Sequence, residues 1–115
     1  MISESEFARI VQEALDSLPE RFSRLVRNVA VAIEDEPGDE DRASLRPNEE
    51  LLGVYRGVPL TARSSYDPLL PDEIALFRGP LGRVSRSHED GVAHIRDTVI
   101  HELGHYFGLS DDELP

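Results

Sequence analysis

Apolar residues recur at helical spacing over residues 3–18, and this pattern predicts an amphipathic helix. The apolar positions are Phe7, Ile10, Val11, Ala14, Leu15 and Leu18. Ser3 and Glu6 have the spacing of a capping box, which fixes the expected start of the helix. Pro19 either ends this helix or opens a second short one, in which Phe22 would face inward. We expect the apolar stripe to form part of the core rather than a surface for a partner.

Three short apolar segments further along the chain predict β-strands. Residues 28–34 alternate between larger and smaller apolar side chains, so both faces of this segment are apolar. A central strand, covered on both sides, has this pattern. Residues 51–56 predict a second strand. Residues 73–78 predict a third, which Gly79 and Pro80 end.

The segment between the first two strands, residues 34–50, is strongly acidic. It holds eight carboxylates and two arginines, interrupted by two prolines and a glycine. We expect a solvated loop here. The alternative is a lid, or a selector of basic substrates, because long loops near a site often carry function.

Residues 88–107 predict a long helix, with Ser87 and Asp90 placed to cap its first turn. One side of this helix is an apolar stripe that we expect to be buried, formed by Val92, Ile95, Val99, Leu103 and Phe107. The opposite side is polar, and on a helical wheel four of its residues fall within about 60° of one another. They are His94, Thr98, His101 and His105.

The polar side of this helix carries the arrangement H-E-x-x-H. His101 and His105 are one helical turn apart, so both imidazoles can reach one metal ion, and Glu102 can lean over that ion as a general base. Gly108 can adopt positive φ and end the helix, after which the chain can bring Asp111 to the metal. Three protein ligands leave a fourth position open, as in a catalytic zinc site.

Asp111 has alternatives as the third ligand. Asp112 and Glu113 follow it directly, and all three acids would also suit a solvated tail. His94 lies two turns before His101, too far to share one metal ion, so we expect it to face solvent.

Several other polar residues near the motif have two explanations each. His88 is either a transition-state donor at the rim of the cleft or a surface residue at the helix start. Asp97 either orients His101 from the preceding turn or is a solvated acid. Tyr106 is expected to be half-buried packing rather than an oxyanion donor, and Tyr66 either reaches the metal cleft or lies in a surface loop.

Residues 101–111 read HELGHYFGLSD and resemble the extended zincin signature HExxHxxGxxD. Residues 78–81, 98–100 and 109–111 extend a resemblance to the short bacterial minimal zincins, a metallopeptidase-like family, over about residues 18–114. The chain departs from the metzincins, because Asp111 stands where they have a third histidine. The only methionine is Met1, so no methionine turn can follow the motif.

This resemblance implies an α+β fold of the minimal zincin-like kind. A small mixed β-sheet of three to four strands would pack with an N-terminal helix and the HExxH helix. The family also implies a zinc-dependent peptidase activity, but no substrate. In zincin-like folds the strand at 73–78 would be a sheet edge along which an extended peptide lies, since unpaired edge groups recognise any peptide backbone. An edge strand without that use is the alternative.

Composition narrows the possible functions further. A chain of 115 residues indicates one domain spanning residues 1–115. The net charge of −11 and a pI near 4.6 argue against nucleic acids and anionic membranes as partners. Cysteine is absent, so only histidines and carboxylates are left as metal ligands. The N-terminus has no basic start or apolar run, so we expect no signal peptide and a cytoplasmic location.

The sequence therefore favours a small zinc metallopeptidase that hydrolyses peptide bonds with metal-activated water and Glu102 as general base. The alternative is a metal-stabilised peptide-binding module with little or no turnover. The short chain suits that alternative, because nothing after the motif can wall the cleft. A partner chain that completes the cleft is a third possibility.

Overall fold

The protein is described by a computed structural model over residues 2–43, 45, 49–57 and 72–108. In chain order its elements are α1 (Glu4–Asp16), α2 (Glu20–Val26), β1 (Val29–Glu34), α3 (Asp39–Arg42), β2 (Gly53–Arg56), β3 (Asp72–Phe77), α4 (Arg78–Val84) and α5 (His88–Tyr106).

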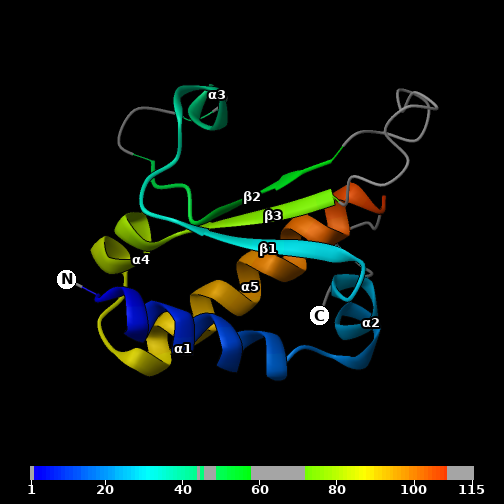
Figure 1. The fold of residues 1–115 in the computed structure, drawn as a ribbon, viewed down its shortest axis with the longest axis horizontal. Coiled ribbons are helices and arrows are strands. Elements are labelled where there is room, and N and C mark those ends of the chain that lie inside the picture. Colours follow the sequence, from blue (N-terminus) through cyan, green and yellow to red (C-terminus); the bar gives the residue numbers. More distant parts are fainter. Residues whose placement is uncertain (1, 44, 46–48, 58–71, 109–115) are drawn as a thin grey trace.

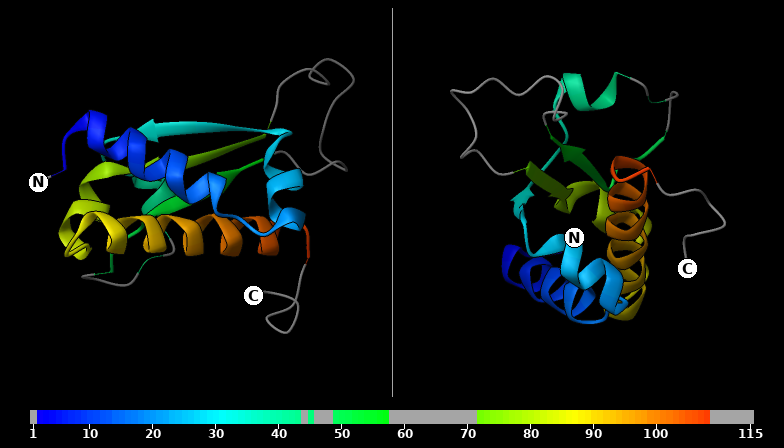
Figure 2. Two further views of the ribbon diagram at one scale, coloured as in Figure 1. Left: turned by 90° about the horizontal axis from the view of Figure 1, so that it is seen from below. Right: turned by 90° about the vertical axis from the view of Figure 1, so that its right-hand side faces the viewer.

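The strands form one mixed sheet in the order β1-β3-β2. β1 runs parallel to β3, and β2 runs antiparallel to it. Helices α1, α2 and α5 lie on one face of the sheet and α3 lies on the other (Figure 1, Figure 2). The predicted α+β fold, with a small mixed sheet packed against an N-terminal helix and the motif helix, is confirmed.

The core lies between the sheet and the layer of α1 and α5. Helix α1 begins at Ser3, whose side chain accepts a hydrogen bond from the Glu6 backbone N–H, as the capping spacing predicts. The predicted apolar stripe of α1 is buried, and it meets side chains from β3 and α5. The central members of this cluster are Phe7, Ile10, Ala14, Phe22, Ile74, Leu76, Ile95, Val99 and Leu103.

Two predictions about the strands are wrong. β1 is an edge strand with Ala30 and Ile33 exposed, not a central strand covered on both sides. The strand predicted at 73–78 is central, so it is not the sheet edge along which a peptide could lie. The physical reason is burial: residues 74–77 of β3 are all fully buried, as a central strand requires, whereas Ala30 and Ile33 of β1 are exposed.

The acidic segment is partly ordered against the sheet rather than a solvated loop throughout. It contains α3, and the Asp41 carboxylate of this helix accepts a hydrogen bond from the Arg56 guanidinium at 2.9 Å. Arg56 also binds Glu34 at 2.7 Å and Glu73 at 3.1 Å, so one arginine joins all three strands to α3. These carboxylates raise the pKa of Arg56, which stays charged. α3 lies on the opposite face of the sheet from α5 (Figure 1).

Helix α4 follows β3 where the sequence predicts only a break at Gly79 and Pro80. Pro80 is the third residue of this helix, within its first turn, where backbone N–H groups have no intrahelical acceptor. A proline there is compatible with a helix start. Gly79 also allows a close approach, since its N–H donates to the Asp35 carbonyl at 2.8 Å and an added Cβ would collide with the Glu36 carboxylate.

Candidate metal centre

Helix α5 carries the HExxH motif in its last turns and positions it by packing its opposite side into the core. Its first turn is capped as predicted, because Ser87 Oγ accepts a hydrogen bond from the Asp90 N–H at 3.1 Å. Most of the predicted apolar stripe is buried or partly buried. Phe107 is the exception: its assignment to the core is wrong, since it lies beyond the last helical residue and is 46% exposed.

The imidazoles of His101 and His105 lie side by side on the exposed surface of α5. Their ring centroids are 5.6 Å apart and their planes differ by 14°. Both residues are exposed, and neither forms an ion pair or hydrogen bond with another residue of the described part of the chain. The two rings are therefore neighbours on one face of α5, without a hydrogen-bond partner among the described residues.

The outer edge of β2 lies beside α5, where Gly53 lies near Thr98 and the Tyr55 ring stacks on Tyr106, and the ladder pattern shows which backbone groups face this edge. The Phe77 N–H donates to the Leu52 carbonyl at 2.9 Å, which makes these two residues a hydrogen-bonded pair. Such pairs alternate with non-hydrogen-bonded pairs along an antiparallel ladder. In the register of β2 with β3, Gly53 and Tyr55 therefore point their N–H and C=O groups away from β3.

The Glu102 carboxylate is half-buried at this edge, where the Tyr55 backbone N–H hydrogen-bonds to it. Burial raises the pKa of Glu102, since a charged carboxylate loses hydration there. Three groups oppose this increase in the pKa of Glu102: the charge on His105, the Tyr55 N–H and the charge on His101. The motif thus places an acid-base group at the strand edge, within electrostatic reach of the two histidines.

An aromatic cluster holds the end of β2 against the end of α5. The Tyr55 and Tyr106 rings stack with centroids 3.9 Å apart, and the Tyr55 hydroxyl donates to Asp72 at 2.7 Å. The expectation that Tyr106 is half-buried packing is confirmed. Sequence reasoning missed Tyr55 and Asp72. The signal that could have found the contact is Gly57 at the end of the strand pattern, because a glycine there often marks a close approach, and an added Cβ would lie 2.6 Å from the Tyr55 ring and 2.8 Å from the Tyr106 ring.

His88 does not belong to the motif site. Its ring binds the carboxylates of Glu13 and Glu6 on α1, and the hydrogen bond to Glu13 is the main cause of a raised pKa for His88. Thirteen residues separate it from His101, which is about 20 Å along a helix. The alternative of a transition-state donor at the cleft rim is therefore wrong.

The remaining polar residues of α5 fit their simpler explanations. His94 is partly exposed, and its Nε2 lies 3.6 Å from an Asp90 oxygen on the preceding turn. The carboxylate of Asp97 is 74% exposed and lies 3.8 Å from Arg96. Among the described residues, neither side chain forms a hydrogen bond or ion pair with the two motif histidines.

Several predicted site residues lie outside the described residues. These are Asp111, its alternatives Asp112 and Glu113, and Tyr66. Gly108 does adopt the predicted positive φ, of 74°, and ends α5. Within residues 2–43, 45, 49–57 and 72–108, no group of three or more His, Cys, Asp or Glu side chains is placed to hold a metal ion. The two imidazoles nevertheless fit zinc, which favours nitrogen ligands over the oxygen ligands of calcium or magnesium.

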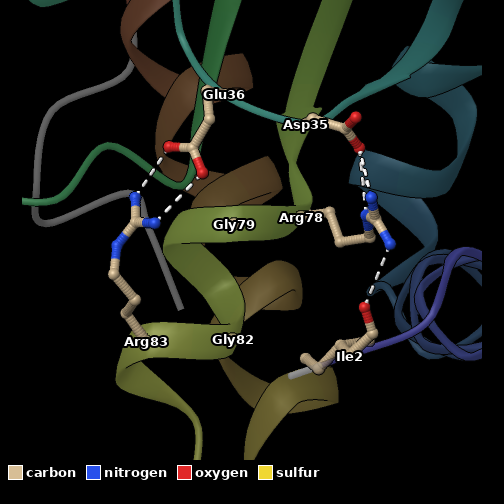
Figure 3. Close-up of a pocket in the computed structure, with 7 residues that line it drawn as sticks. All are labelled: Ile2, Asp35, Glu36, Arg78, Gly79, Gly82 and Arg83. Atoms are coloured by element: carbon tan, nitrogen blue, oxygen red, sulfur yellow. Dashed lines mark hydrogen bonds and ion pairs between the residues drawn. The ribbon is translucent and has the colours of Figure 1, made fainter.

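A cavity of about 400 Å³ lies at the other end of α5, beside α4 (Figure 3). Two ion pairs line it: Arg78 with Asp35 at 2.8 Å and Arg83 with Glu36 at 2.8 Å. Figure 1 places α4 near the start of α5, so this cavity is separate from the histidines. Its charged groups already neutralise one another, and it does not form the predicted cleft.

Comparison with known proteins agrees with the sequence resemblance. The family model described as zincin-like metallopeptidase matches residues 26–115. One solved structure of similar fold, a conserved hypothetical protein from Thermo thermophilus, is 25% identical with a TM-score of 0.61. The match covers 92% of this chain and 94% of that chain. No curated protein matches this chain. No helix among the described residues is long and apolar enough to cross a membrane.

Proposed function

Because the chain belongs to the zincin-like metallopeptidase family, we propose that it is a zinc-dependent peptidase that hydrolyses extended peptides at the outer edge of β2. The observation that carries this proposal is the arrangement at the end of α5. Two exposed, nearly parallel imidazoles lie beside a half-buried glutamate, which itself touches a strand edge. A structural metal site needs no glutamate in that position.

Zinc would be held by His101, His105 and Asp111. Histidine and carboxylate are the ligand types of catalytic zinc sites, and three of them leave a position for water. Bound there, zinc supplies a Lewis acid that lowers the pKa of water towards neutrality and polarises a carbonyl oxygen.

Glu102 is the general base in this proposal. Its carboxylate takes a proton from the attacking water and passes that proton to the leaving nitrogen as the peptide bond breaks. The Tyr55 N–H supports this role by fixing the direction of the carboxylate. The stack of Tyr55 on Tyr106 supports it further, because it holds the strand edge at a constant distance from the helix.

The substrate backbone would pair with the Tyr55 carbonyl, since the Tyr55 N–H is already bound to Glu102 and Gly53 is buried. Extended peptides add to exposed sheet edges through main-chain hydrogen bonds, so this mode recognises peptides with little regard to sequence. β2 replaces residues 73–78 in this role, because β3 is paired on both sides.

A cleavage assay with matched variants tests the proposal. Zinc-loaded wild type is incubated with a peptide library, together with Glu102→Gln and the control Glu89→Gln in the exposed first turn of α5. We expect wild type and Glu89→Gln to cleave alike. We expect Glu102→Gln to lose about 10²–10⁴-fold in activity while it keeps its zinc.

Two outcomes would contradict this proposal. Undiminished cleavage by Glu102→Gln would show that another group is the base. Zinc and peptide binding by wild type without any cleavage would favour the metal-stabilised binding module.

A further inference from the structure

Asp72, the first residue of β3, binds a side chain of β2 on the face of the sheet that α5 covers. Its carboxylate accepts a hydrogen bond from the Tyr55 hydroxyl at 2.7 Å. Tyr55 is paired with the core residue Ile74, so Asp72 is its diagonal neighbour in the ladder, within reach of an aromatic side chain. A hydroxyl that donates to a carboxylate at this distance forms a strong hydrogen bond. This bond therefore fixes the far end of the Tyr55 ring.

The next residue of β3, Glu73, has its partner on the other face of the sheet. It binds Arg56 at 3.1 Å, and Arg56 also binds Asp41 of α3. Adjacent side chains of a strand point to opposite faces, so the two acids that begin β3 meet two consecutive residues of β2. Of these two contacts, the one between Asp72 and Tyr55 lies on the side of the motif helix.

Tyr55 contacts the motif helix at two points. Its ring stacks on Tyr106, the last residue of α5, with ring centroids 3.9 Å apart. Its backbone N–H hydrogen-bonds to the carboxylate of Glu102, one turn earlier. In the helical ladder the Tyr106 N–H donates to the Glu102 carbonyl, so the stacked ring holds the turn of α5 that carries the glutamate.

Gly57 limits the movement of the Tyr55 ring. This glycine follows β2, and an added Cβ would lie 3.1 Å from Asp72 Cγ as well as against both tyrosine rings. The Gly57 backbone therefore lies directly beside both the hydrogen bond and the stack. The ring is held by its hydroxyl, by its stacking face and by the glycine.

We propose that Asp72 is a positioning residue for Glu102 and acts through Tyr55. The Asp72 carboxylate keeps the Tyr55 ring stacked on Tyr106, and the stacked ring keeps the Tyr55 N–H within hydrogen-bonding distance of the Glu102 carboxylate. Asp72 thereby directs the general base without touching the substrate. This role rests on the proposed peptidase function, in which Glu102 takes a proton from water.

Amide hydrogen exchange of the full chain tests this role independently of activity. The Tyr55 amide reports its bond to Glu102, and Glu102→Ala gives the exchange rate of the released amide. The Val54 amide is the internal control, because Val54 and Ala75 form a hydrogen-bonded pair of the ladder between β2 and β3. In Asp72→Ala we expect exchange at Tyr55 to be at least about fivefold faster and exchange at Val54 to be unchanged. Asp72→Asn keeps an acceptor for the hydroxyl and should behave like wild type.

Kinetics of the zinc-loaded protein gives a second measurement. Asp72→Ala should lower kcat about tenfold or more, because a misdirected base slows the chemical step, and should leave KM within about threefold of wild type. Asp72→Asn should restore kcat. If wild type cleaves no peptide, the proposed function fails, whereas the exchange rates still decide whether Asp72 positions Glu102.

Tyr55→Phe removes the same hydrogen bond from its donor side, so it replaces Asp72→Ala if that variant does not fold. It should give the same increase in exchange at the amide of residue 55. An unchanged exchange rate at this amide would overturn the proposal. Equal acceleration at Val54 would overturn it as well, because Asp72 would then only hold the two strands together.

Discussion

The histidines at the two ends of α5 have opposite surroundings. At the start of the helix, His88 is bound by two carboxylates from α1 and ties the two helices together. At the other end, His101 and His105 lie exposed and nearly parallel, with no ion pair to the described residues. In a chain with 23 acidic side chains and four histidines, an imidazole easily finds a carboxylate partner. The exposed pair, His101 and His105, is therefore the unusual one. A bound cation would make these two imidazoles metal ligands, a role that His88 does not have.

The packing beneath the two ends differs as well, and two glycines allow a direct test. An added Cβ at Gly53 would lie 2.8 Å from Leu76 Cδ2 and 2.8 Å from Thr98 Cγ2, under the motif end of α5. At Gly91, near the helix start, the nearest atom is the flexible tip of Ile10 at 3.2 Å.

The largest effect on stability is expected from Gly53→Ala. Overpacking between strand and helix should lower the free energy of unfolding by about 1–3 kcal/mol. Gly91→Ala should stay within about 1 kcal/mol of wild type, because the gain in helix propensity offsets a small shift of Ile10. Urea unfolding measures both variants. Equal losses would mean that β2 does not hold α5 more tightly at the motif end.

A smaller effect is expected from Tyr55→Phe. The variant loses the hydrogen bond to Asp72 but keeps the ring that stacks on Tyr106, so stability should fall by about 0.5–1.5 kcal/mol. Tyr55→Ala, which also removes the stack, should cost more and should reduce cleavage if the edge of β2 positions the substrate. A Tyr55→Phe variant as unstable as Tyr55→Ala would show that the ring contributes nothing.

The smallest effect concerns His88 and depends on pH. Its pKa is raised in the folded protein, mainly by the hydrogen bond to Glu13, so its contribution to stability is complete below its unfolded pKa of about 6.5. That contribution is lost as pH rises through the folded pKa. The melting temperature of wild type should therefore exceed that of His88→Gln more at about pH 6 than at about pH 9. An equal difference at both values would contradict the pairing.

Local patterns predicted the helices and the motif well. Ser3 and Ser87 cap α1 and α5 where their spacing indicated, and Gly108 ends α5 with positive φ. These features depend on a few neighbouring residues, so the sequence shows them directly. The side-by-side placement of His101 and His105 follows from the helical repeat in the same way.

The order of the strands could not be predicted, because it depends on contacts between distant segments. β1 has two apolar faces, the usual sign of a central strand, yet β3 takes that place with four consecutive buried residues. Arg56 is another case: its three carboxylate partners lie 15, 17 and 22 residues away in the chain. No local pattern indicates such a network, nor the contact of Tyr55 with Asp72.

Zinc binding by matched histidine variants tests the central claim most directly. Stoichiometry and affinity are measured by chelator competition for wild type, His101→Ala and His88→Ala. We predict about one zinc per chain for wild type and for His88→Ala. His101→Ala should bind zinc at least about 100-fold more weakly, since loss of an outer-shell partner alone costs about 10–100-fold. Wild type without zinc affinity, or His101→Ala with unchanged affinity, would contradict the account.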